Sequence, residues 1–247
     1  RRLLSFSRPP FRIVISRNGM VRQFLVQDKT YFLNSVESSI RRGENGEKEA
    51  WLRLRSFDKQ NTCDLVRREI AKMENAGAKR IYLDLRDNPG GLVRESECVA
   101  SLFLGPHKLF ARLRYEDHPE IREFIPGLNA ESNEGEGETV DLFTSQNQAT
   151  RLPLRLEINQ NTASAAEMLA AALQDHRRAQ ILGAKSFGKG SMQSSFHPWG
   201  DPRFYLIFTT HSIFRPSGQA LNLNGIKPDL VTHRAEGENF PREIHLS

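Results

Sequence analysis

The sequence predicts an α/β protein with a mixed sheet, on its alternating pattern and its length. β-branched and aromatic runs alternate along the chain with amphipathic helical segments, and turn residues separate them. The 247 residues are enough for one large domain, or for a medium domain with a smaller partner. A chain of this length buries roughly 70–75% of its unfolded surface, so we expect it to be stable without a metal or a disulfide.

The first expected elements are two short strands at residues 11–16 and 21–26. Asn18-Gly19 lies between them, and Asn-Gly between two β-rich runs is a strong hairpin signal. Residues 35–50 are polar and rich in Gly and Glu, so we predict a linker there. The predicted domains are residues 1–34, the linker at 35–50, a main domain over 51–235 and a tail over 236–247.

Strands and helices alternate in the main domain. Asn61 or Thr62 caps the first helix, and Gly77 ends it. Gly105-Pro106 ends the second helix, and the third is rich in alanine. The strands are expected at residues 51–57, 80–85, 108–115, 152–158, 179–182 and 204–210, and the helices at 61–76, 94–104 and 163–174.

Residues 116–150 are polar and acidic, with ESNEGEGE (131–138) at their centre. Such a composition buries too little apolar surface to form a core of its own. We therefore predict a long solvated excursion, with a lid over a binding site as the alternative.

Charge and cysteine content limit the function classes. The net charge is +5, but the basic pairs, such as Arg41-Arg42, are scattered among acids without a basic aromatic stripe, so we predict no nucleic-acid partner. Cys63 and Cys98 permit one disulfide or two buried thiols, and they offer no metal-ligand spacing. The sequence contains no run of 18 apolar residues, so we predict no membrane-spanning helix. The chain has neither a start methionine nor a signal peptide, so we expect a fragment or processed form of a longer precursor.

The first candidate for chemistry is Ser164, in the stretch NTASAAE (161–167). A strand ends here and a helix begins, and the unpaired amides and dipole of a helix N-terminus favour negative charge. Alanines on both sides let a substrate backbone approach closely. A serine in the first turn of an ordinary helix is the alternative interpretation of this stretch taken alone.

A glycine-rich loop, residues 183–190, nearly matches the phosphate-binding pattern G-x-x-x-x-G-K-[ST]. The match fails because Gly190 replaces the hydroxyl residue that would hold Mg²⁺, and no apolar-periodic helix follows. The glycines at 188 and 190 favour instead a close-packed backbone that carries Lys189 inward. Burial disfavours the ammonium form of lysine, and a neutral amine beside a serine hydroxyl can take its proton.

The turn DNPGG (87–91) follows a predicted strand. Glycines at the exit of a strand allow backbone amides to point into a cleft, as the oxyanion hole of an acyl-transfer site requires. Asn-Pro-Gly-Gly is also a good turn in its own right, which is the alternative interpretation.

Four stretches together carry a resemblance to a known family. They are LDLRDNPGG (83–91), NQNTASAAEM (159–168), ALQDHRRAQILGAKSFGKGSMQ (172–193) and FRPSGQALNLNGIKPDL (214–230). In order, spacing and flanking residues they resemble the carboxyl-terminal processing proteases, also called tail-specific proteases, and the likeness covers roughly residues 48–232. The resemblance implies a serine endopeptidase that cleaves proteins near their carboxyl termini.

The resemblance also implies roles for the matching residues. Ser164 matches the nucleophile, Lys189 the general base, and Gln193 the glutamine that orients the lysine. Residues 189 and 193 share a face of an extended segment, so we expect a hydrogen bond between them. The oxyanion-hole positions match the backbone amides of Ala165 and of the Gly90-Gly91 turn, with Gly91 favoured over Gly90.

A fold and a setting are implied as well. The family's core is similar to the crotonase-like fold, and residues 10–26 resemble the last strands of the PDZ domain that precedes this core. Residues 1–34 are therefore expected to be a remnant of that domain. The expected substrate is an extended protein or peptide bound along a strand edge. The family implies no cofactor, and it places the protein in the bacterial periplasm or cell envelope, where an activating partner or an oligomer is an open alternative.

Three rival functions stay open. A Ser-His hydrolase would use His176, His197 or His211, and its rate would level off above about pH 7, whereas a lysine base gives a rate that rises into the alkaline range. An acyl-CoA enzyme of the crotonase type also uses glycine amides, but it does not need a serine and lysine pair. A catalytically silent module of the same fold would only bind extended peptides.

Overall fold

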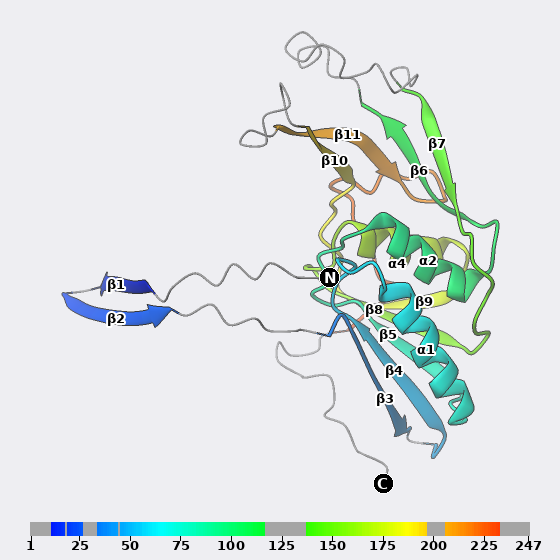
Figure 1. Ribbon diagram of the computed structural model, residues 1–247. Helices are drawn as coiled ribbons and strands as arrows, with labels where there is room; N and C mark the ends of the chain where they lie inside the picture. The colour runs from blue at the N-terminus through cyan, green and yellow to red at the C-terminus, as the bar shows by residue number, and fades with distance from the viewer. Residues whose placement is uncertain are drawn as a thin grey trace, which may run out of the picture. The chain divides into compact units, whose positions relative to one another are not determined.

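A computed structural model describes residues 11–17, 19–26, 34–43, 45–116, 137–196 and 206–232. Contacts divide the chain into two units, Arg1–Asn34 and Ser35–Ser247. Figure 1 labels helices and strands of both units.

The smaller unit contains the predicted hairpin, which is confirmed. Strands β1 (Phe11–Arg17) and β2 (Met20–Val26) pair antiparallel, and Gly19 in the turn has a φ of 75°. Apolar side chains are exposed on both faces of this ribbon, for example Val14 on one face and Ile15 on the other. A two-stranded ribbon is marginally stable on its own, so these faces need further protein to cover them.

The larger unit is built on a six-stranded sheet. Its strands are β3 (Val36–Arg42), β4 (Lys48–Leu54), β5 (Arg80–Asp84), β8 (Leu154–Ile158), β9 (Ala179–Gly183) and β12 (Leu230–Val231). Their order is β12-β9-β8-β5-β4-β3. All neighbours are parallel except β3 and β4, which are antiparallel. The α/β class with a mixed sheet is thereby confirmed.

The predicted linker at residues 35–50 is wrong, because it contains β3 and the first residues of β4. The two strands pair along their whole length, from Val36 opposite Leu54 to Arg42 opposite Lys48. β3 is the edge strand of the sheet. Polar and charged residues are common on edge strands because they discourage pairing with other chains. The composition that indicated a linker is therefore that of a protected edge.

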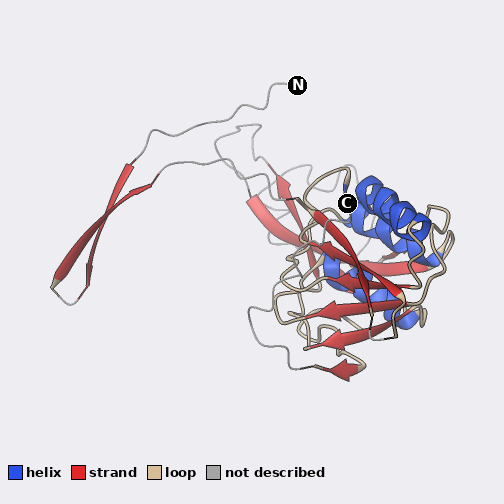
Figure 2. Cartoon of the chain, turned by 90° about the horizontal axis from the view of Figure 1, so that it is seen from below, coloured by secondary structure: helices blue, strands red, loops and turns tan. Residues whose placement is uncertain are grey.

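Three helices, α1 (Thr62–Asn75), α2 (Val93–Leu104) and α4 (Ala165–Asp175), cover one face of this sheet (Figures 1 and 2). Alternate residues of β4, such as Leu52 and Leu54, are fully buried on that side. The alternation follows from the two-residue period of a strand. All three helices begin within two residues of the predicted positions.

A second, four-stranded antiparallel sheet has the order β10-β11-β6-β7. Its strands are β6 (Leu109–Tyr115), β7 (Thr139–Phe143), β10 (Ser191–Phe196) and β11 (Leu206–Phe214). β7 corrects the prediction of an unbroken excursion over residues 116–150, since Arg112 of β6 pairs with Asp141 of β7 and also binds its carboxylate. Most of the acidic centre and the predicted lid lie outside the described residues, as does the predicted tail.

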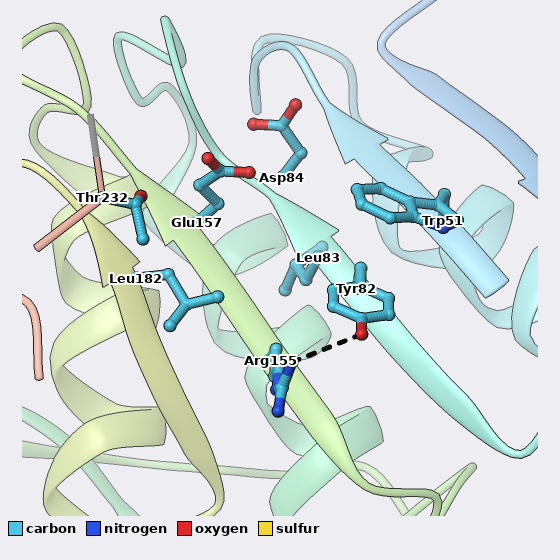
Figure 3. Close-up of a pocket in the computed structure, with 8 residues that line it drawn as sticks. All are labelled: Trp51, Tyr82, Leu83, Asp84, Arg155, Glu157, Leu182 and Thr232. Atoms are coloured by element: carbon cyan, nitrogen blue, oxygen red, sulfur yellow. Dashed lines mark hydrogen bonds between the residues drawn. The ribbon is translucent and has the colours of Figure 1, made fainter. Parts of the chain in front are cut away.

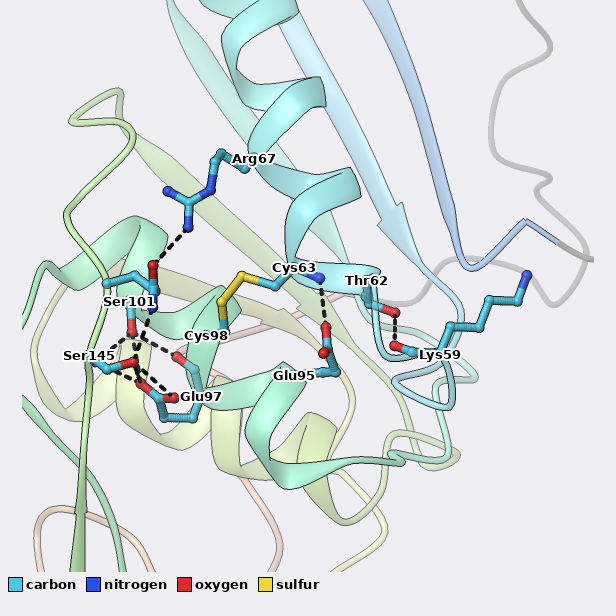
Figure 4. Close-up of a disulfide and its surroundings, with 10 residues drawn as sticks. Lys59, Thr62, Cys63, Arg67, Glu95, Glu97, Cys98, Ser101 and Ser145 are labelled. Carbon is cyan, nitrogen blue, oxygen red and sulfur yellow. Dashed lines mark hydrogen bonds between the residues drawn. A yellow bond between two sulfur atoms is a disulfide. The ribbon is translucent and has the colours of Figure 1, made fainter. Parts of the chain in front are cut away.

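A disulfide between Cys63 and Cys98 joins α1 to α2 (Figure 4). The sequence permitted either this disulfide or two buried thiols. Glu95, also on α2, is buried and accepts a hydrogen bond from the Cys63 backbone N–H at 2.9 Å. Two links thus hold the start of α1 against α2. None of the helices in the described part of the chain is long and apolar enough to cross a membrane.

Candidate active site

Ser164 lies where β8 gives way to α4, as predicted, and its backbone is strained. It is the N-cap of α4, with φ 55° and ψ −123°. Few non-glycine residues adopt a positive φ, and such outliers cluster at functional sites because the surrounding structure must hold them. Ser164 is half-buried. Its position combines the positive end of a helix with a turn that presents the side chain.

Gly90 lies directly against this turn. A Cβ built on Gly90 would stand 2.8 Å from Ser164 Cβ and 2.9 Å from both the Ala163 carbonyl oxygen and the Ala165 backbone nitrogen. The Ala163 N–H also donates to the Asn88 carbonyl oxygen at 2.9 Å. The glycine turn and the serine turn therefore touch backbone to backbone, which only a residue without a side chain permits.

Two backbone amides beside Ser164 have no acceptor in the described part of the chain, those of Ala165 and Gly91. The Gly90 N–H, by contrast, donates to Asn88 Oδ1 at 2.9 Å. An amide already committed to a buried side chain is a poor donor to a substrate. The geometry therefore favours Gly91 over Gly90 as the partner of Ala165 in holding an oxyanion.

Glu167 joins the serine loop to the lysine loop, a role that was not predicted from the sequence. Its side chain is fully buried. Oε2 accepts from the backbone N–H of Ser164 at 2.9 Å and of Lys189 at 2.8 Å. Oε1 accepts from the Gly188 N–H at 2.7 Å and from Ser186 Oγ. One carboxylate therefore fixes the backbone of both candidate catalytic residues. The S-x-x-E spacing of a capping box is the sequence signal that could have identified it.

Lys189 and Gln193 are placed differently from the expected arrangement. Lys189 is half-buried, and within the described ranges its Nζ makes no hydrogen bond to Ser164 Oγ. Gln193 is exposed on β10, where the register shifts after Met192, and its Nε2 donates to Ser191 Oγ at 3.4 Å. The expected bond from Gln193 to Lys189 is not formed in this structure, in which the Gln193 amide binds Ser191 instead.

Asp87 links the glycine turn to the serine loop through two side-chain hydrogen bonds. Its Oδ1 accepts from Asn161 Nδ2 at 2.9 Å and from Asn159 Nδ2 at 2.8 Å. These bonds, with the nearby charges of Arg53 and Arg86, outweigh partial burial and hold the pKa of the Asp87 carboxyl below its usual value. Asp87 also has a positive φ of 60°. No local sequence pattern predicts this clamp, because its members are 72 and 74 positions apart.

The structure argues against a histidine base for Ser164 and against a phosphate-binding loop. His176 lies at the far end of α4 from Ser164, roughly 16 Å along an 11-residue helix, and its Nε2 contacts the Leu109 carbonyl oxygen. His211 lies on β11 with its ring edge-on to Tyr115, and His197 lies outside the described residues. Strand β10, not a helix, follows the glycine-rich loop, so a phosphate-binding loop is excluded.

A hollow of about 180 Å³ lies elsewhere, on the face of the six-stranded sheet opposite the helices (Figure 3). Trp51 and Tyr82 stack there with ring centroids 4.5 Å apart, and Arg155 Nη1 donates to the Tyr82 hydroxyl at 3.4 Å. Asp84 in its wall is already bound by Arg86 through two hydrogen bonds. Among the described residues, no serine or lysine lines this hollow. The described residues also include no group of three or more His, Cys, Asp or Glu placed to hold a metal.

A strained serine at a helix N-terminus, two amides without an acceptor in the described part of the chain and a lysine loop bound by the Glu167 carboxylate lie together on an α/β fold. The family model described as peptidase family S41 matches residues 48–232. The chain belongs to this family of serine peptidases.

Two relatives show the extent of the similarity. The chain is 33% identical over 216 residues to a carboxyl-terminal-processing protease of Picosynechococcus sp., covering 87% of this chain and 46% of that protein. It is 28% identical over 232 residues to the tail-specific protease of Haemophilus influenzae, covering 89% of this chain and 28% of that protein. The chain thus spans less than half of the length of these curated relatives.

The fold is shared with a solved structure titled as a photosystem II D1 C-terminal processing protease. That structure has a TM-score of 0.67 at 22% identity, and the match covers 92% of this chain and 56% of that chain. At this level of identity the likeness establishes the fold.

Proposed function

We propose that the protein is a serine endopeptidase that cleaves protein substrates near their carboxyl termini, with Ser164 as nucleophile and Lys189 as general base. The observation that carries the proposal is the Glu167 carboxylate, which binds the backbone of both residues. A structural helix cap would not need to hold a second loop that ends in a lysine.

In the proposed reaction the neutral Lys189 amine takes the Ser164 proton while Oγ attacks the scissile carbonyl. The amides of Ala165 and Gly91 receive the oxyanion. Lys189 then protonates the leaving amine, and it activates the water that hydrolyses the acyl-enzyme. Gln193 orients Lys189 when substrate closes the site, since catalytic hydrogen bonds often tighten only in the complex.

An extended substrate fits the outer edge of β10. This strand is the edge of the four-stranded sheet and carries Gln193. An extended peptide can pair with such an edge through its backbone, which leaves its side chains to provide specificity. Because backbone pairing does not depend on the peptide's side chains, this way of binding explains how one site accepts the unfolded tails of different proteins.

Cleavage of an unfolded, tailed protein tests the proposal. Ser164→Ala and Lys189→Ala should each abolish cleavage, and Lys185→Ala, a change in the same glycine-rich loop, should not. A rate that rises into the alkaline range identifies a lysine base, whereas a plateau above about pH 7 identifies a histidine. Full activity in the Lys189→Ala protein would overturn the mechanism. Inactivity of the unmodified protein, together with retained peptide binding, would favour the silent module.

We also propose an oxidising setting, the bacterial periplasm or cell envelope. The disulfide between Cys63 and Cys98 supports this, because such bonds persist outside the reducing cytosol. The doubly apolar hairpin of the smaller unit supports its assignment as part of a PDZ domain. Alkylation of the protein in freshly lysed cells is the test of location. Thiols that react without prior reduction would contradict it.

A further inference from the structure

Three large apolar side chains are exposed beside the loops of the proposed site, and we call them the apolar rim: Leu92, Phe187 and Leu223. Leu92 follows Gly91 directly, and Phe187 stands two residues before Lys189. Phe187 is 66% exposed and Leu223 is 83% exposed. These are the two highest values among the large apolar side chains in the described part of the larger unit.

The exposure is not the result of a loose backbone. The Phe187 N–H donates to the Thr162 carbonyl oxygen at 3.0 Å, and the Leu223 N–H donates to the Gly188 carbonyl oxygen at 2.9 Å. A Cβ on Gly188 would stand 3.2 Å from the Leu223 backbone. The main chain of both residues is thus fixed against loops that hold the proposed catalytic pair, while their side chains face solvent.

Leu223 is also strained. Its φ is 61°, and it is the only apolar residue among the non-glycine residues with positive φ in the described ranges. Asparagine tolerates this conformation better than leucine, and asparagines stand on both sides, at 222 and 224. A leucine that is strained and contributes almost nothing to the core points to a contact made only when something binds.

We propose that the apolar rim receives an apolar side chain of the substrate next to the scissile bond, and that Leu223 and Phe187 set the preference for it. The inference rests on the proposed peptidase function of Ser164 and Lys189. Contact would remove apolar surface of both partners from water, which favours binding of apolar over polar residues. The rim therefore assigns a substrate class, chains with an apolar residue beside the cleaved bond.

A library of unstructured peptides tests the preference, with mass spectrometry reporting the residues that flank each cleaved bond. The unmodified protein should cleave apolar-flanked bonds about tenfold or more faster than matched polar-flanked bonds. Leu223→Asn keeps a residue suited to positive φ while removing the apolar side chain, and Phe187→Ser removes the second contact. Both variants should lose most of the tenfold preference.

A matched control and a stability measurement exclude a structural explanation. Leu230→Asn makes the same chemical change at an exposed position in β12 and should leave the preference unchanged. Leu223→Gly relieves the strained φ, so its Tm should equal or exceed that of the unmodified protein while the preference falls. A lower Tm in this variant would indicate that the leucine is there for folding.

The outcomes separate the rim from the peptidase proposal. If the unmodified protein cleaves the library but the variants at 187 and 223 keep its preference, the rim inference is wrong and the peptidase function stands. If nothing is cleaved, the peptidase proposal fails. The rim is then judged by fluorescence anisotropy of one apolar and one polar peptide on the Ser164→Ala protein. Equal binding with and without Leu223→Asn overturns it, and about tenfold weaker binding of the apolar peptide supports it.

Discussion

Replacing Glu167 by glutamine removes one of the two oxygens that hold the serine loop and the lysine loop together. Each oxygen accepts two hydrogen bonds: Oε2 holds two backbone N–H groups, and Oε1 holds one N–H group and the Ser186 hydroxyl, which can instead accept from an amide. One or two backbone N–H groups therefore lose their acceptor, depending on which oxygen becomes the amide nitrogen. The side chain is fully buried, and water cannot replace the lost acceptor. An unsatisfied buried donor costs about 1–3 kcal/mol, so we expect a loss of about 1–6 kcal/mol in the free energy of unfolding.

Turnover should fall as well, because the freed N–H groups belong to the loops that place Ser164 and Lys189. A displacement of about 1 Å in a catalytic group can cost about 100-fold in rate, so kcat should drop by about that factor or more. Urea unfolding followed by tryptophan fluorescence gives the stability, and cleavage of an unfolded protein gives kcat.

Glu95→Gln is the matched control, since Glu95 is also a buried helical glutamate and accepts one bond, from the Cys63 N–H. A glutamine can keep that bond through its remaining oxygen, so turnover should be unchanged. The reasoning is refuted if Glu167→Gln unfolds within about 1 kcal/mol of the unmodified protein and turns over substrate at the same rate.

Three further predictions concern the disulfide, the glycine turn and acid stability. The Cys63→Ser, Cys98→Ser double variant should lose about 3–4 kcal/mol of unfolding free energy, because the bond closes a loop with a sequence separation of 35. In urea unfolding, the unmodified protein with reductant should have the same stability as this double variant. Gly90→Ala should lower Tm more than Gly218→Ala does, and it should abolish cleavage. Both glycines have a positive φ, but only a Cβ at position 90 would meet other atoms within 4 Å. Equal Tm values for the two variants would contradict the close approach at Gly90. Burial raises the pKa of Asp175, but hydrogen bonds from Arg215 and Ser217 outweigh it and leave the pKa below its usual value. The stability that this carboxylate contributes is present above about pH 4 and is lost as the pH falls through the lowered pKa. The free energy of unfolding of the Asp175→Asn variant should therefore fall less steeply below about pH 4 than that of the unmodified protein. An equal dependence on pH in the two proteins would contradict this prediction.

Local signals predicted the elements that carry the site. The apolar periodicity of residues 62–75 and the cap before them predicted α1 within a residue of its observed ends. The alanine-rich run after Thr162 predicted a helix with Ser164 at its start, which the structure confirms. These predictions succeeded because capping, periodicity and turn preferences involve residues only a few positions apart.

Pairings over long distances in the chain were not predictable in the same way. The polar composition of β3 predicted a linker, because its pairing with β4 leaves no signal in the residues of β3 themselves. The Asp87 clamp joins residues more than 70 positions apart, and no local pattern records it. Which amide of the Gly90-Gly91 turn already has an acceptor depends on the Asn88 side chain, whose Oδ1 binds the Gly90 N–H, and no local pattern in the sequence indicates this.

The sequence by itself determined the fold class and the family, and it is the source of the proposal that Ser164 and Lys189 carry the chemistry. Only the tertiary structure decided how these residues are held: a buried Glu167 that bridges two loops, a disulfide between two helices, and exposed Phe187 and Leu223 beside the site. The physical reason is that residue type and spacing limit what chemistry is available, whereas hydrogen-bond acceptance and burial depend on which distant segments meet. Those meetings are set by the packing of the whole chain.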